Sequence, residues 1–178
     1  MKKATLFLGA LLTLFFISCE GPAGPPGRDG LDGAPGAEFE AAAFEIEVDL
    51  NLNTDLNRYE FYNQYPSDIV LLPDDVILMY RLEEVSDGLD VWRQMPQPYF
   101  SGEGLLYYNF DFTQGDYTVL LEPEFEANLV PVDLTDNQVF RIVIVPSDLG
   151  TAVDMDQTNL SSVLSALGVE ESDIKKLH

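Results

Sequence analysis

Few side chains in this sequence could carry out covalent or acid–base chemistry. The chain has one histidine, His178, and one cysteine, Cys19. A serine–histidine–aspartate triad would depend on that single histidine, and both residue types are too few for a zinc site made of histidine and cysteine. Neither a G-x-S-x-G elbow nor a phosphate-binding loop is present. We therefore expect no enzyme activity, no cofactor and no metal site.

Aspartate and glutamate, 31 in number, keep two alternatives open. A pair of carboxylates facing across a cleft could make the chain an extracellular glycan-acting enzyme. Oxygen ligands could instead make it a calcium-dependent adhesive module. Asn51, Asn53, Asp55 and Asn57 have the alternate spacing of an EF-hand loop, but Leu56 stands where that loop needs glycine. We expect a strand end and a polar turn there.

The N-terminal segment gives Cys19 a role. Lys2 and Lys3 precede an apolar stretch, residues 6–17, which is shorter than the roughly 20 residues that a membrane-spanning helix needs and is typical of a signal peptide. The four residues 16–19 resemble the lipobox of Gram-negative lipoproteins, with Phe16 in place of the usual leucine. The resemblance implies cleavage of residues 1–18 and a lipid anchor (diacylglycerol and an acyl chain such as palmitate) on Cys19.

A strict repeat of three residues follows Cys19 and Glu20. Glycine recurs with proline between, as in the Gly-X-Y repeat of collagen, where only glycine fits the crowded axis of the triple helix. We divide the chain into residues 1–18, a lipidated stalk over 19–36, and one domain over 37–178. The glycines of the repeat are Gly21, Gly24, Gly27, Gly30, Gly33 and Gly36.

The stalk has two interpretations. As a single-chain, proline-rich spacer, its 16 residues from Gly21 to Gly36 would extend roughly 50 Å, at about 3.1 Å per residue. As a triple helix, it would make the protein a homotrimer. Five triplets are few for a stable triple helix, so we favour the spacer. Both interpretations place the domain away from a membrane surface.

Alternation of apolar and polar residues dominates residues 37–178 and predicts a mainly β fold. Asp87-Gly88 is typical of a tight hairpin turn, and Pro96 and Pro98 are expected to end a strand. Short strands separated by turns indicate an antiparallel β-sandwich, immunoglobulin-like or related. The expected strands cover residues 44–52, 58–63, 76–85, 90–95, 105–112, 117–122 and 139–145.

One short C-terminal helix is expected to pack on the sandwich. Leu160, Val163, Leu164 and Leu167 have helical spacing. Thr158 or Asn159 can cap its start, and Gly168 suits the position after its end.

A possible binding face lies on the strand over residues 105–112. Tyr107, Asn109 and Asp111 alternate with apolar residues and so share one polar face. Trp92, at the centre of another strand, is expected in the core. The net charge of −22 argues against nucleic acid and against adsorption on anionic lipid.

The lipidated cysteine followed at once by glycine triplets resembles a group of small, uncharacterised collagen-like lipoproteins of Gram-negative bacteria. Residues 91–96, 107–113 and 137–146 look like the domain of that group. The resemblance implies a cell-envelope protein and no catalytic residue. Glu20 is not the aspartate associated with inner-membrane retention, so we expect an outer-membrane anchor and an unknown protein or glycan partner.

The spacer interpretation predicts that unlipidated residues 20–178 and residues 37–178 are both monomers. Light scattering of the two fragments measures this. A trimer in the longer fragment alone would contradict the spacer and establish a triple helix, whereas trimers of both would place assembly in the domain.

Overall fold

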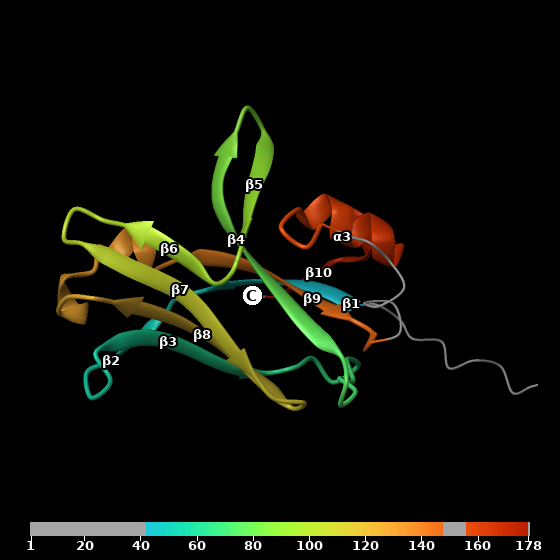
Figure 1. Ribbon diagram of the computed structural model, residues 1–178, viewed down its shortest axis with the longest axis horizontal. Coiled ribbons are helices and arrows are strands. Elements are labelled where there is room, and N and C mark those ends of the chain that lie inside the picture. Colours follow the sequence, from blue (N-terminus) through green and yellow to red (C-terminus); the bar gives the residue numbers. More distant parts are fainter. Residues whose placement is uncertain (1–41, 148–155, 178) are drawn as a thin grey trace, which may run out of the picture. The chain divides into compact units, whose positions relative to one another are not determined.

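The computed structural model describes residues 42–147 and 156–177. The predicted signal segment, Cys19, the glycine triplets and His178 lie outside these residues. Within the described part, the fold is mainly β, with two five-stranded sheets and one α-helix (Figure 1). None of the described helices is long and apolar enough to cross a membrane.

The first sheet, sheet A, has the strand order β10-β1-β9-β4-β5. Strand β9 lies at its centre, antiparallel to β1 and β4, as its nearly continuous apolar sequence indicates. The short β10 extends the sheet by pairing parallel to β1. The strands are β1 (Ala42–Val48), β4 (Val76–Ser86), β5 (Leu89–Gln94), β9 (Gln138–Val145) and β10 (Lys175–Leu177).

The second sheet, sheet B, has the order β2-β3-β8-β7-β6, and all of its pairs are antiparallel. The weak alternation over residues 58–63 does form a strand, β3. The 3-10 helices η2 (Ala127–Leu129) and η3 (Val132–Leu134) link β8 to β9. The strands are β2 (Asn51–Asn53), β3 (Arg58–Gln64), β6 (Gln97–Phe100), β7 (Leu105–Phe112) and β8 (Asp116–Pro123).

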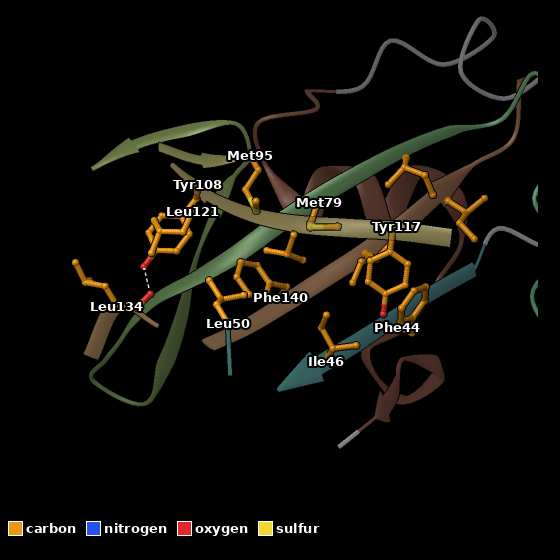
Figure 2. Packing of buried hydrophobic residues seen from close by; sticks show 14 of the residues in the cluster. Phe44, Ile46, Leu50, Met79, Met95, Tyr108, Tyr117, Leu121, Leu134 and Phe140 are labelled. Carbon is orange, nitrogen blue, oxygen red and sulfur yellow. Dashed lines mark hydrogen bonds between the residues drawn. The ribbon is translucent and has the colours of Figure 1, made fainter. Parts of the chain in front are cut away.

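The two sheets pack face to face around a hydrophobic core (Figure 2). Alternate residues of β1, β4 and β9 meet alternate residues of β7 and β8. Because side chains alternate along a strand, each sheet turns one face inward and the other outward. The prediction of a mainly β, sandwich-like fold is confirmed. The buried residues include Phe44, Ile46, Met79, Leu106, Tyr108, Tyr117, Leu121, Phe140 and Ile142.

The expectation of one strand over residues 44–52 is wrong. Strand β1 ends at Val48, and β2 begins at Asn51 in the other sheet. Leu50 between them is buried, and its N–H donates to the carbonyl of Thr135 at 2.8 Å. The alternation of apolar residues continues in phase across this crossing, so the sequence gives no sign of the break.

The hairpin between β4 and β5 is confirmed, with its turn at Asp87 (φ 53°) and Gly88 (φ 80°). Both residues have the positive φ of a type I′ turn. The outer part of this hairpin, residues 84–90, is exposed and extends away from the sheets in Figure 1. A bulge between Leu82 and Glu84 shifts the register of the hairpin.

The expectation that the strand before Pro96 and Pro98 ends there is confirmed, since β5 ends at Gln94. The sequence did not predict the next strand, β6, in which Pro98 pairs with Tyr107. Strand β6 is the edge of sheet B. A proline is accommodated there because the missing N–H can face away from the neighbouring strand.

The predicted helix is α3 (Leu160–Leu167), and it covers the outer face of sheet A. Leu160, Val163 and Leu164 are buried against residues that include Tyr80 and Val143. The side chain of Asn159 accepts a hydrogen bond from the N–H of Ser162, and Gly168 has φ 68°. Both capping expectations are therefore confirmed. The 3-10 helix η4 (Glu171–Asp173) and β10 follow.

Replacing a core side chain tests the packing. Leu121 has no exposed surface, so Leu121→Ala should lower the free energy of unfolding by about 2–5 kcal/mol. Leu129 is 51% exposed, and Leu129→Ala should change it by no more than about 0.5 kcal/mol. Urea denaturation of both variants measures the difference. A similar loss of unfolding free energy in the two would contradict the placement of Leu121 in the core.

Candidate binding sites

The predicted binding face on β7 exists as a surface. Tyr107, Asn109 and Asp111 alternate with the buried Leu106 and Tyr108, and therefore share the outer face of sheet B. The neighbouring strand β8 places Glu122, Leu120 and Thr118 directly opposite them. Helix α3 covers the other sheet. We call the outward side of sheet B the open face.

Polar side chains on the open face are linked to one another. Asn109 donates to Glu122 at 3.1 Å, and Glu60 accepts from Asn53 at 2.8 Å and from Arg58 at 2.9 Å. These hydrogen bonds, that from Asn53 first and that from Arg58 second, hold the pKa of Glu60 below its ordinary value. The face therefore presents polar groups that are already fixed in position.

An apolar patch lies at one edge of the open face, on the hairpin of β6 and β7. Register pairs Pro98 with Tyr107 and Phe100 with Leu105, so all four side chains lie on the same side of the sheet. Phe100 is 78% exposed. Of these four residues the sequence pointed to Tyr107 alone, because no strand was expected over residues 97–100, where β6 carries Phe100.

The proposed calcium loop is a turn whose side chains are engaged with the backbone. The Oδ1 atom of Asn53 accepts from the N–H groups of Asp55 and Leu56. Asn57 (φ 50°) donates to the carbonyl of Phe125 and accepts from the N–H of Ala127. Across residues 42–147 and 156–177, no cluster of three or more histidine, cysteine, aspartate or glutamate side chains could hold a metal ion.

A second candidate site is a groove on the outer face of sheet A, between the β4–β5 hairpin and α3. Its volume is about 310 Å³. Trp92, expected in the core, is partly buried and packs against the apolar cluster under α3, where it also lines this groove. The lining residues come from widely separated parts of the chain: Gly88, Leu89, Asp90, Trp92, Arg141, Leu160, Ser161, Leu164 and Glu171.

Arg141 is the centre of an ionic network beside this groove, and only 2% of its side chain is exposed. Its Nη2 contacts Glu45 at 2.6 Å, and its guanidinium donates to both oxygens of Glu171, at 2.9 and 2.8 Å. Lys176 contacts Glu45 at 3.0 Å. The guanidinium carbon lies 4.2 Å from the centroid of the Trp92 ring, which is a cation–π contact.

The network changes the ionisation of Glu45. Burial alone would raise the pKa of this carboxyl, but hydrogen bonds from Arg141 and Lys176, together with their positive charges, outweigh burial and hold the pKa below 4.5. In the sequence Glu45 is one of the polar residues that alternate with apolar ones between residues 44 and 52, and alternation alone would place it on the solvent side of the strand. The signal that could have revealed its partner was Arg141, the one charge in an otherwise apolar strand.

Comparison with protein-family models, with curated proteins and with solved structures finds no match to this chain.

Glu45→Gln tests the ionic network. Because the folded-state pKa of Glu45 is lowered, its charge stabilises the fold above about pH 4.5, and this contribution is lost as the pH falls through the folded-state value. We expect the variant to reduce the free energy of unfolding by about 1.5–3 kcal/mol at pH 7 and by less at pH 3.

Urea denaturation at the two pH values measures this effect. Glu103→Gln, the same change in an exposed loop, is the control and should leave stability nearly unchanged at both. An equal loss for Glu45→Gln at pH 7 and pH 3 would show that the charge on Glu45 does not act as described.

Proposed function

We propose that this protein is a lipid-anchored interaction protein of the cell envelope, which binds a protein partner through the open face of sheet B. In this proposal Cys19 carries the lipid, Gly21–Gly36 form the spacer, and an immunoglobulin-like or related β-sandwich is presented at its end. The observation that carries the proposal is the exposed apolar patch beside a fixed polar network on one uncovered sheet face.

The apolar patch supports a protein partner. Large apolar side chains grouped on a surface mark interaction sites when polar residues surround them. Phe100 is 78% exposed, and Tyr107 lies diagonally across from it on β7, two residues from Leu105, with which Phe100 pairs. Aromatic side chains of this kind supply much of the binding energy at the centre of protein interfaces.

The polar network supports the same partner class. Asn109 is already bonded to Glu122, and Glu60 to Asn53 and Arg58. Side chains that are ordered before binding lose less conformational entropy when a partner arrives. The proposal assigns no catalytic step to this face, because Glu60 and Glu122 are engaged by neighbouring donors.

The anchor and its location are supported by sequence. The apolar segment before Cys19 and the residue Glu20 after it favour an outer-membrane lipoprotein, and the glycine repeat favours a stalk. A net charge of −22 keeps the domain off an anionic lipid surface. Contact with the membrane is thus assigned to the lipid and contact with the partner to the domain.

A photo-crosslinking side chain at position 107 of the full-length, anchored protein tests the proposal. We expect adducts with another protein after irradiation of cells. A probe at Ser165, on the exposed side of α3 and so on the opposite side of the domain, is the matched control and should give none of these adducts. Phe100→Ser should reduce the yield about tenfold, as loss of a central aromatic contact does.

Three outcomes would overturn this assignment. Equal adducts at both probe positions would mean non-specific collision. Adducts only between copies of this chain would replace the partner by self-association. The absence of any protein adduct at position 107, with the protein folded and anchored, would remove the open face as a protein-binding site.

A further inference from the structure

The groove between the β4–β5 hairpin and α3 combines an aromatic ring with hydrogen-bonding groups of both kinds. From this combination we propose that it binds a neutral saccharide of one or two rings, independently of the open face. Trp92 and Arg141 line it with their side chains stacked, and Asp90 on the hairpin and Glu171 after α3 line it from separate elements.

Acceptors for sugar hydroxyls are present and accessible. Asp90 is exposed, and its side chain has no hydrogen bond or ion pair with any other described residue. The side chain of Glu171 is 67% exposed although Arg141 holds both of its oxygens. A carboxylate oxygen has more than one lone pair, so Glu171 can accept from a ligand hydroxyl while its position is fixed. Ser161 adds a hydroxyl at the helix wall.

One hydrogen-bond donor of a residue that lines the groove has no partner. The Nε atom of Arg141 is buried and has no hydrogen-bond partner among the described residues. Buried donors are nearly always paired in folded proteins, so this N–H indicates an acceptor that the chain itself does not provide. A hydroxyl group can both donate, as Asp90 and Glu171 require, and accept, as the N–H of Arg141 requires, whereas a protonated amine or a guanidinium can only donate.

The apolar side chains of the groove suit the C–H face of a sugar ring. A pyranose ring has a face of C–H groups, and such a face packs on an indole ring. Trp92 is only partly buried and lines the groove, and Leu89 on the hairpin wall is 72% exposed. The lining of the groove as a whole is more polar than apolar, which suits a ligand that carries many hydroxyl groups beside one apolar face.

The charge and the volume of the groove restrict the kinds of saccharide that it can bind. Asp90 and Glu171 on the two walls repel a carboxylate, so uronic and other acidic sugars are disfavoured. A volume of about 310 Å³ is at the small end of the range for ligand sites, which begins near 300 Å³. The groove is therefore matched to a short stretch of a neutral glycan.

Fluorescence gives a direct test, because Trp92 is the one tryptophan of the chain. The unlipidated protein is titrated with cellobiose, maltose and N,N′-diacetylchitobiose, with glucuronic acid as the anionic comparison. We expect a saturable change in Trp92 emission with at least one neutral disaccharide and none with glucuronic acid. The absence of a response to all three disaccharides would overturn the proposal, as would a response to glucuronic acid of the same size.

A matched pair of variants locates the ligand. Asp90→Asn and Asp87→Asn make the same chemical and charge change on the same hairpin, but only Asp90 lines the groove. We expect Asp90→Asn to weaken binding about fivefold or more, since a bond to a charged acceptor becomes a neutral one, and Asp87→Asn to leave it unchanged. Equal effects of the two variants would mean that the ligand responds to net charge and does not occupy the groove.

Discussion

Strand β9 is buried on both of its faces, and this constraint determines what must be arranged around it. Its inward residues, such as Phe140 and Ile142, require sheet B as a cover, and its outward Val143 requires α3. A strand covered on both sides must place any charge it carries in a matched environment. Arg141 therefore brings Glu45 and Glu171 with it, and the β4–β5 hairpin contributes Trp92 above its guanidinium.

Most of the strands and the helix could be predicted from periodicity, because each has one apolar face that burial selects. Two features could not be predicted in this way, the crossing at Leu50 and the place of Pro98 in a strand. The crossing at Leu50 keeps the alternation in phase, so a change of sheet is invisible in the sequence. Pro98 conflicts with a central strand but not with an edge strand, and position within a sheet is a property of the whole fold.

The two candidate sites differ in how far they could be foreseen. The open face could be found in part because Tyr107, Asn109 and Asp111 follow one another at every second position of a single strand. The groove could not, because Asp90, Arg141 and Glu171 come from separate elements that only the tertiary fold brings together. Local pattern reveals a face of one strand, whereas a site between elements depends on long-range packing.

The place of β1 in sheet A has a consequence for how the domain is completed. The first strand of the described fold pairs only with β9 and β10, the last two. A chain that emerges with its N-terminus first, from a ribosome or through a membrane pore, holds β1 without a partner until nearly its whole length has passed. Pairing across such a sequence separation is slow, and sheet A can be completed only after the residues of β9 and β10 have emerged.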